Sequence, residues 1–213
     1  FFSLPMIIGN LFQQAYTMAD SAIVGRLVGE NALAAVGAAY SLTNIFICIA
    51  IGGGIGASVI VSQYFGRGSY GKLKKAVYTA LISFLLISGL LGGFGLLFSR
   101  KIMIVLNTPA EVLDMSVTYL KIYFLGLPFL FMYNVLSSMF NALGKSRIPL
   151  YFLIFSSVFN IVLDWIFVAN FHLDVAGVAW ATLIAQGVSV VGSFTILWKE
   201  MRTAFLRKRN CFP

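Results

Sequence analysis

The sequence has few charged residues. Only 10% of its 213 residues are Asp, Glu, Lys or Arg, whereas 60% are hydrophobic and the mean hydropathy is +0.92. Soluble domains carry about 25% charged residues, so this composition excludes a soluble domain and predicts an integral membrane protein. The net charge of +8 does not indicate nucleic-acid binding, because the basic residues lie in short stretches between apolar spans.

The sequence also has little cysteine and histidine. Cys48 and Cys211 are too far apart for a metal-ligand spacing, and His172 is the only histidine, which we interpret as a solvated loop residue. No GxSxG or HExxH motif is present, and the glycine run at 52–56 is not followed by the Lys-Ser/Thr of a phosphate-binding loop. These absences argue against an enzyme, and we expect no cofactor.

Six apolar stretches each reach the roughly 20 residues that a membrane span requires. They lie at 4–26, 33–62, 76–98, 116–140, 148–170 and 175–198. We therefore predict an all-α membrane protein with six transmembrane helices in residues 1–200. The glycines at 52–56 favour close helix packing or a flexible bend. The loop at 99–114 includes an apolar stretch, and we expect it to lie along the membrane interface.

The two ends of the chain are predicted to lie in the cytoplasm. Eleven of the fifteen basic residues fall in the second loop, the fourth loop and the region after the last span, and basic loops are cytoplasmic. Residues 201–213 then form a basic cytoplasmic tail or the start of a linker. The first span has full length and no basic leader, so we expect no cleavable signal peptide. Because the chain begins with Phe1, we expect the native N-terminus to lie upstream.

The first span carries several polar residues. Gln13, Tyr16, Thr17 and Asp20 fall on one face of a helix with 3.6 residues per turn. A carboxylate at membrane depth costs about 2.5–3.5 kcal/mol on insertion scales, and such residues usually face a bundle interior or an aqueous cavity. The pattern favours a functional face, although a polar patch that holds helices together is the alternative.

A second polar face is predicted in the fifth and sixth spans. Asn160 and Asp164 lie four residues apart, as do Thr182 and Gln186, so each pair shares a helix face. An intramembrane carboxylate with such neighbours can exchange a proton or a metal ion, as the coupling step of a secondary transporter requires. The alternative is a fixed network bonded only to neighbouring helices.

Four segments resemble the multidrug and toxic compound extrusion (MATE) transporters, and the resemblance covers nearly the whole chain. They are MADSAIVGRLVGENALAAVG, GGGIGASVIVSQYFGRG, NALGKSRIPL and FNIVLDWIFV. The last segment is more similar to the DinF-like branch than to the NorM-like one. Such proteins have twelve spans in two six-helix lobes, and this chain corresponds to the N-terminal lobe. The resemblance implies export of cationic or amphipathic compounds by proton or sodium antiport across a bacterial or archaeal plasma membrane.

The resemblance also implies roles for individual residues. The residues expected to bind the coupling cation are Gln13, Tyr16, Asp20, Asn160, Asp164 and Thr182. Asp20 and Asp164 would be metal ligands only if sodium is the coupling ion. Pro5 corresponds to a proline at which the first helix is proposed to bend, although a proline in the first turn needs no kink. Met18 and Phe159 would offer an adaptable apolar surface to hydrophobic cations.

Three other functions remain open. A lipid-linked oligosaccharide flippase of the same broad superfamily would favour basic residues inside the spans, and only Lys121 lies near that position. A channel would show a selectivity filter or a charged ring, and neither is evident. A non-transporting membrane scaffold predicts that neutralising Asp20 and Asp164 leaves function intact and raises stability.

Overall fold

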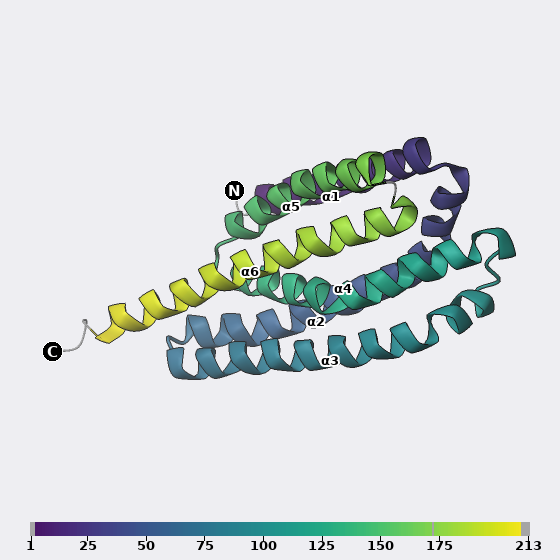
Figure 1. The fold of residues 1–213 in the computed structure, drawn as a ribbon. Helices are drawn as coiled ribbons and strands as arrows, with labels where there is room; N and C mark the ends of the chain where they lie inside the picture. Colours follow the sequence, from purple (N-terminus) through teal and green to yellow (C-terminus); the bar gives the residue numbers. More distant parts are fainter. Residues whose placement is uncertain (1–2, 172, 210–213) are drawn as a thin grey trace.

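The chain folds into a bundle of long helices in a computed structural model that describes residues 3–171 and 173–209 (Figure 1). Side chains are not described at 3–6, 10 and 201–209. The helices are α1 (Ser3–Ile23), α2 (Glu30–Gly66), α3 (Tyr70–Val105), α4 (Ala110–Ala142), α5 (Arg147–Trp165) and α6 (Asp174–Arg209). Two five-residue π-helical turns, η1 (Val24–Val28) and η2 (Ile166–Asn170), follow α1 and α5. No strand occurs in the described ranges.

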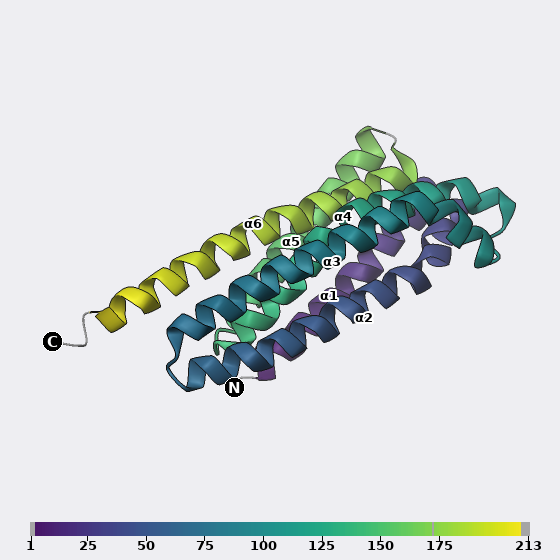
Figure 2. The same ribbon diagram turned by 90° about the horizontal axis from the view of Figure 1, so that it is seen from below.

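Five helices are long and apolar enough to cross a membrane. By length and composition these are Glu30–Gly66, Tyr70–Val105, Ala110–Ala142, Arg147–Asn170 and Asp174–Glu200. Helix α1 completes the bundle and packs along α5. Figure 2 shows the bundle from below, with the N-terminus, the α2–α3 turn and the end of α6 all at one end of it. The prediction of an all-α membrane protein with six long helices is therefore confirmed.

Several helices extend past the apolar stretches that predict them. A helix of 36 residues, the length of both α3 and α6, is about 54 Å long, whereas the hydrocarbon core of a bilayer is about 30 Å thick. Hydropathy thus locates the part inside the hydrocarbon and misses the polar turns beyond it. The expected loop at 99–114 is wrong in consequence: α3 continues to Val105, α4 begins at Ala110, and only 106–109 connect them.

Tight turns join the long helices. Gly144, between α4 and α5, has a φ of +75°, which a residue without a Cβ adopts without strain. Its N–H donates to the Asn141 carbonyl (3.0 Å), and the Lys145 N–H donates to the Phe140 carbonyl (2.9 Å). These bonds satisfy carbonyls left open at the end of α4. They also reverse the chain, so that α5 runs back through the bundle.

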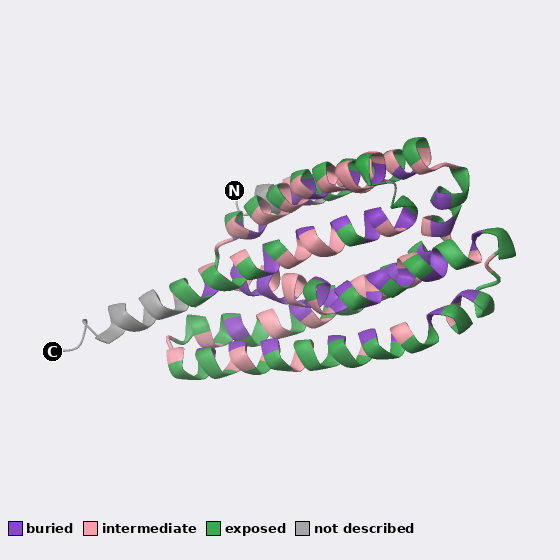
Figure 3. Cartoon of the chain, viewed as in Figure 1, coloured by how far each residue is buried: buried purple, intermediate pink, exposed green. Residues whose placement is uncertain are grey.

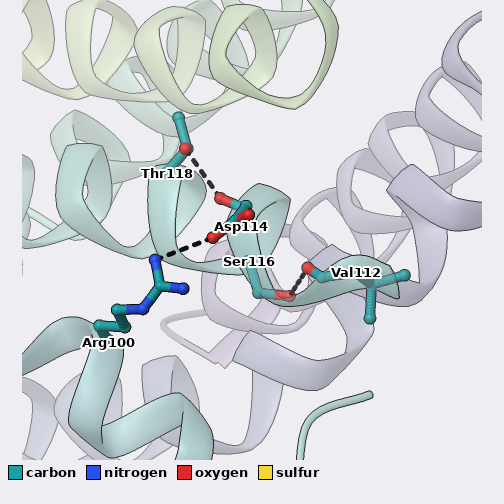
Figure 4. A network of polar contacts seen from close by, with 5 residues as sticks. All are labelled: Arg100, Val112, Asp114, Ser116 and Thr118. Atoms are coloured by element: carbon teal, nitrogen blue, oxygen red, sulfur yellow. Dashed lines mark hydrogen bonds and ion pairs between the residues drawn. The ribbon is translucent and has the colours of Figure 1, made fainter. Parts of the chain in front are cut away.

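At the opposite end of the bundle, polar contacts fix the α3–α4 connection (Figure 4). Arg100 Nη1 on α3 lies 2.9 Å from Asp114 Oδ1 on α4, and both side chains are exposed. The buried Ser116 hydroxyl lies 2.9 Å from the Val112 carbonyl and 3.2 Å from the Ala35 carbonyl on α2. Because Ser116 is buried and the ion pair is hydrated, the Ser116 contacts hold this end more firmly than the ion pair does.

Helix α4 lies at the centre of the fold. It packs against α2, α3 and α6, and Figure 3 shows a concentration of buried residues along it. The close approach of α3 depends on two glycines, because a Cβ on Gly92 would lie 2.8 Å from the Phe124 carbonyl and one on Gly95 2.3 Å from the Phe124 ring. The Phe124 carbonyl lacks its usual helical donor, since Pro128 has no N–H. Because these two α3 residues have no Cβ, Phe124 of α4 packs directly against the α3 backbone.

The glycine run at 52–56 serves close helix packing. This was one of the two predicted uses, the other being a flexible bend. Helix α2 is continuous across it, so no break occurs there. A Cβ on Gly53 would lie 2.3 Å from the Phe84 ring, and one on Gly54 would lie 2.7 Å from the Ser138 hydroxyl. The run therefore lets α3 and α4 approach α2 closely.

Candidate functional site

A polar cluster lies in the interior of the bundle, and α5 and α6 supply its centre. Asp164 is fully buried and Asn160 is 2% exposed. The Asn160 amide is hydrogen-bonded at both ends when its nitrogen faces Asp164: the nitrogen donates to Asp164 Oδ2 (3.0 Å), and the oxygen accepts from the Thr182 N–H (3.1 Å) and hydroxyl (3.3 Å). Asn160 thus links the carboxylate on α5 to α6.

Helix α1 adds a second carboxylate to the cluster. The Asp20 side chain forms a hydrogen-bond contact with Asp164, and the Tyr16 side chain forms one with Thr182. Two ionised carboxylates in contact repel each other, so a proton or a cation between them stabilises the pair. One oxygen of each acid, Asp20 Oδ1 and Asp164 Oδ1, is buried without a hydrogen-bond partner among the described residues. These oxygens suit a proton or a hard cation, which prefers oxygen ligands.

The helices that carry the acids both end in π-helical turns close to the cluster. Turn η1 starts four residues after Asp20, and η2 starts two residues after Asp164. The two turns contact each other, and Val24 and Val168 belong to one buried apolar cluster. Isolated π-helical turns occur frequently at functional sites. Here they join α1 to α5 and thereby hold the two acids on facing helices.

The structure brings together five of the six predicted cation-binding residues. Tyr16, Asp20, Asn160, Asp164 and Thr182 form the cluster. Gln13 is exposed on α1, and the described residues give its side chain no hydrogen bond; only its backbone carbonyl accepts one, from the Thr17 hydroxyl at 2.9 Å. Its predicted role stays untested. The Pro5 backbone lies in the first turn of α1, but its side chain is outside the described part, and the hinge stays a prediction.

Two tyrosines on α4 complete the cluster and were missed by the sequence reasoning. Tyr119 lies close enough to Asp20 and Asp164 to interact electrostatically with both. Tyr123 lies one turn further along α4, and its hydroxyl donates to the Thr43 carbonyl on α2 (3.1 Å). The two tyrosines lie four residues apart in an apolar span and therefore share a helix face, which is the same pattern that identified Asn160 and Asp164. Tyrosine is also common at membrane interfaces, which makes that signal weaker for tyrosine than for a carboxylate.

A recess that is partly open to the surroundings lies between α4 and α6 beside the cluster. Its polar lining consists of Tyr119, Tyr123, Thr182 and Gln186, and small residues at Gly126 and Ala179 keep it open. The described residues contain no group of three or more His, Cys, Asp or Glu side chains that could hold a metal ion. A sodium ion here would therefore depend on the two acids together with neutral oxygens such as those of Asn160 and Thr182.

Comparison with known proteins identifies the family. The sequence model of the MatE family matches residues 5–166. The chain belongs to the MatE family. Two curated MATE relatives are "Probable multidrug resistance protein YpnP" of Bacillus subtilis, 32% identical over 92% of this chain, and "Multidrug export protein MepA" of Staphylococcus haemolyticus, 29% identical over 92%. The chain spans 44% and 43% of their lengths, less than half of each.

Solved MATE structures share the fold. The straight conformation of a MATE protein has a TM-score of 0.87 at 26% identity, covering 95% of this chain and 45% of that one. A MOP superfamily transporter from Pyrococcus furiosus has a TM-score of 0.88 at 25% identity, covering 94% and 44%. MATE multidrug exporters are transporters rather than enzymes, so the expectation of no enzyme is confirmed. The comparisons do not distinguish the DinF-like branch, which stays a prediction.

Proposed function

We propose that this chain is the N-terminal lobe of a secondary transporter that exports cationic or amphipathic compounds in exchange for protons or sodium ions. The observation that carries the proposal is the contact between Asp20 on α1 and Asp164 on α5. Two carboxylates on different membrane-spanning helices are costly unless a cation or proton binds them. Reversible binding at that contact is what couples an ion gradient to a conformational change.

The proposed coupling step uses only residues of the cluster. When a proton or sodium ion binds between Asp20 and Asp164, the repulsion between them falls and α1 is held against α5. When the ion leaves, the repulsion returns and favours a different packing of α1. Asn160 and Thr182 orient Asp164 in both states. Because α1 is the helix that meets α5 at the acids, a shift of α1 changes the shape of the interior that substrate occupies.

The proposed substrates follow from charge and surface chemistry. Met18 lies on α1 two residues before Asp20 and is 73% exposed, and Phe159 stacks on Phe155 at 5.6 Å. A flexible thioether and aromatic rings adapt to varied apolar groups, and aromatic faces attract cations. Carboxylates add selectivity for positive charge. The named relatives support multidrug export as the activity of the longer protein.

We propose that both ends of this segment are cytoplasmic and that a second six-helix lobe of the same protein completes the transport path. Helix α1 starts and α6 ends at the same end of the bundle as the α2–α3 and α4–α5 turns (Figure 1). Lys145 and Arg147 in the α4–α5 region lie at that end, as do the basic residues near the start of α3. This arrangement fits the positive-inside rule.

Transport by the full-length protein in proteoliposomes tests the proposal. The vesicles are loaded with a fluorescent cationic dye, a proton gradient and a sodium gradient are imposed separately, and the parent is compared with Asp164→Asn. We expect one gradient to drive dye movement and the substitution to abolish it. Asp114→Asn is the matched control, since this carboxylate is exposed and pairs with Arg100 outside the cluster; it should transport like the parent.

Two results would contradict the proposal. If dye moves equally well in Asp164→Asn, the acid pair is structural. If neither gradient moves the dye in the parent protein, the proposed substrate class is wrong. That result would favour the alternative function, a lipid-linked oligosaccharide flippase.

A further inference from the structure

Aromatic side chains connect α3 to α6 at the end of the bundle where α3 begins. The rings of Tyr78 on α3 and Trp198 on α6 meet edge to face, with their centroids 6.0 Å apart. Phe194 lies one turn before Trp198 on α6, and its ring is 6.1 Å from the Trp198 ring. Trp198 is 51% exposed. Because tryptophan and tyrosine prefer the boundary between hydrocarbon and lipid headgroups, these rings place the membrane interface at this level of the bundle.

Lysine side chains lie directly beyond the aromatic rings, on the side of the headgroups. The Lys74 ammonium lies 5.7 Å from the centroid of the Tyr78 ring, and Lys74 and its neighbour Lys75 are both exposed. Lys199, which follows Trp198 on α6, is exposed as well. An ammonium beside an aromatic ring is attracted by the negative face of that ring. The Tyr78 ring therefore helps to hold Lys74 at the level where lipid phosphates lie.

The acidic residues of the sequence leave this end of the bundle positively charged. Glu200 is the acid near the lysines, and it forms an ion pair with Lys145 of the α4–α5 turn. The other six acids lie in the interior cluster or at the opposite end of the bundle: Asp20, Asp164, Glu30, Glu111, Asp114 and Asp174. The surface around Lys74 thus carries a net positive charge, which is complementary to an anionic partner.

Apolar side chains continue from the aromatic rings toward the middle of the membrane on both helices. On α3, Ile82 and Leu85 lie on the same face as Tyr78 and are exposed. On α6, Val191 lies one turn before Phe194 on the same face and is exposed too. Beneath these faces, α3 and α6 both pack against α4 through one buried apolar cluster. The surface therefore has a charged end, an aromatic middle and an apolar remainder, in the order that a phospholipid presents.

We propose that this surface binds an anionic phospholipid, whose phosphate lies against Lys74 and Lys75 and whose acyl chains lie along the exposed faces of α3 and α6. Basic side chains at the membrane surface attract anionic lipids, and the aromatic rings fix the depth at which the headgroup lies. A lipid bound there contacts both helices and so stabilises their packing on α4. The inference does not rest on the proposed antiport function, because it uses no residue of the polar cluster.

Fluorescence quenching in liposomes tests the proposal. The full-length protein is reconstituted in mixtures of phosphatidylcholine and phosphatidylglycerol, and one of the two lipids carries brominated acyl chains, which quench a tryptophan that they contact. The part of the quenching that is lost in Trp198→Phe reports on Trp198 alone. Each lysine near the surface contributes about a fivefold preference for anionic lipid. We therefore expect Trp198 to favour phosphatidylglycerol over phosphatidylcholine by about tenfold or more.

Two lysines on the same helix provide the test variant and its matched control. Lys74→Gln should lower the preference for phosphatidylglycerol about fivefold, and Lys74→Arg should retain it. Lys101→Gln is the control, because the Lys101 ammonium also lies beside a ring, 5.6 Å from the Phe98 centroid, but at the opposite end of α3. Both glutamine variants lose one charge and one contact with a ring. Only Lys74→Gln should change the quenching of Trp198.

Three results would overturn the proposal. Equal quenching by brominated phosphatidylglycerol and brominated phosphatidylcholine would show that the lipid around Trp198 is not selected. An equal fall in Lys74→Gln and Lys101→Gln would show that the preference follows the net charge of the protein rather than this surface. If inorganic phosphate displaces phosphatidylglycerol from Trp198 while chloride at the same ionic strength does not, the lysines bind free phosphate in place of a lipid headgroup.

Discussion

The Tyr123 hydroxyl on α4 donates a hydrogen bond to the backbone carbonyl of Thr43 on α2, at 3.1 Å. The bond joins the wall of the recess to a neighbouring helix, so it fixes the Tyr123 ring where the recess is lined. In a membrane-spanning segment a hydroxyl without a partner costs free energy, and this bond gives the Tyr123 hydroxyl a partner. Tyr123 therefore contributes to the shape of the recess as well as to its polarity.

Tyr123→Phe should destabilise the protein modestly. The substitution removes one hydrogen bond, which contributes about 0.5–1.5 kcal/mol, and leaves the ring in place. We expect a lower midpoint of thermal unfolding for the full-length protein in detergent. Tyr151→Phe is the control, because Tyr151 is 67% exposed and should show no change. Equal midpoints for the two variants would show that the Tyr123 bond contributes nothing to stability.

The α3–α4 crossing should tolerate a methyl group at one glycine and reject it at the next. A Cβ on Gly92 would lie 2.8 Å from the Phe124 carbonyl, a backbone atom, whereas one on Gly93 meets nothing within 4 Å. Gly92→Ala should therefore destabilise the protein by about 1–3 kcal/mol, and Gly93→Ala should be neutral or stabilising because Ala favours helix. Thermal unfolding of the two variants against the parent measures the difference. A Gly92→Ala variant as stable as Gly93→Ala would contradict the close approach.

How much of this could be predicted from the sequence depends on what each signal reports. Hydropathy located six helices because a helix that crosses the hydrocarbon layer needs about 20 apolar residues. It did not predict that α3 extends to Val105, because that part of the helix lies beyond the apolar span. Asp20, Asn160 and Asp164 were found because polar residues at helical spacing are rare inside spans. Their contact across two helices depends on which helices are neighbours, and periodicity within one helix carries no such information.

Other features had weaker signals. Gly92 and Gly95 are ordinary residues in an apolar sequence, and their role appears only when Phe124 is seen against them. Gln13 shares the polar face of α1 by periodicity, yet it is exposed while Asp20 faces α5. The polar face predicted for α1 extends beyond the part of the helix that contacts α5. The sequence thus indicated the face correctly and overestimated how much of it meets α5.

The ion pair between Lys145 and Glu200 should contribute little to stability. It connects the α4–α5 turn to α6 outside the apolar part of the bundle, and both side chains are about 40% exposed. Exposed pairs contribute about 0.2–1 kcal/mol and weaken with salt. A double-mutant cycle with Lys145→Ala and Glu200→Ala should give a coupling energy in that range at low salt and a smaller one at high salt. A salt-independent coupling well above it would show that the pair is shielded from water.

Thr182→Val should weaken binding of the coupling cation more than it weakens the fold. The substitution keeps the shape of the side chain but removes the hydroxyl that contacts Asn160 and Tyr16. Two hydrogen bonds at about 0.5–1.5 kcal/mol each correspond to roughly a tenfold loss or more in cation affinity. In the proteoliposome assay, the cation concentration for half-maximal transport should rise by about that factor.

The control for Thr182 lies on the same helix. The exposed Thr195 hydroxyl bonds only to the Val191 carbonyl of its own helix (2.8 Å) among the contacts described. Thr195→Val makes the same chemical change away from the cluster and should leave the cation dependence of transport unaltered. If both variants shift that dependence equally, the effect belongs to α6 as a whole. A shift confined to Thr182→Val would instead tie cation affinity to the chain of bonds from Thr182 through Asn160 to Asp164.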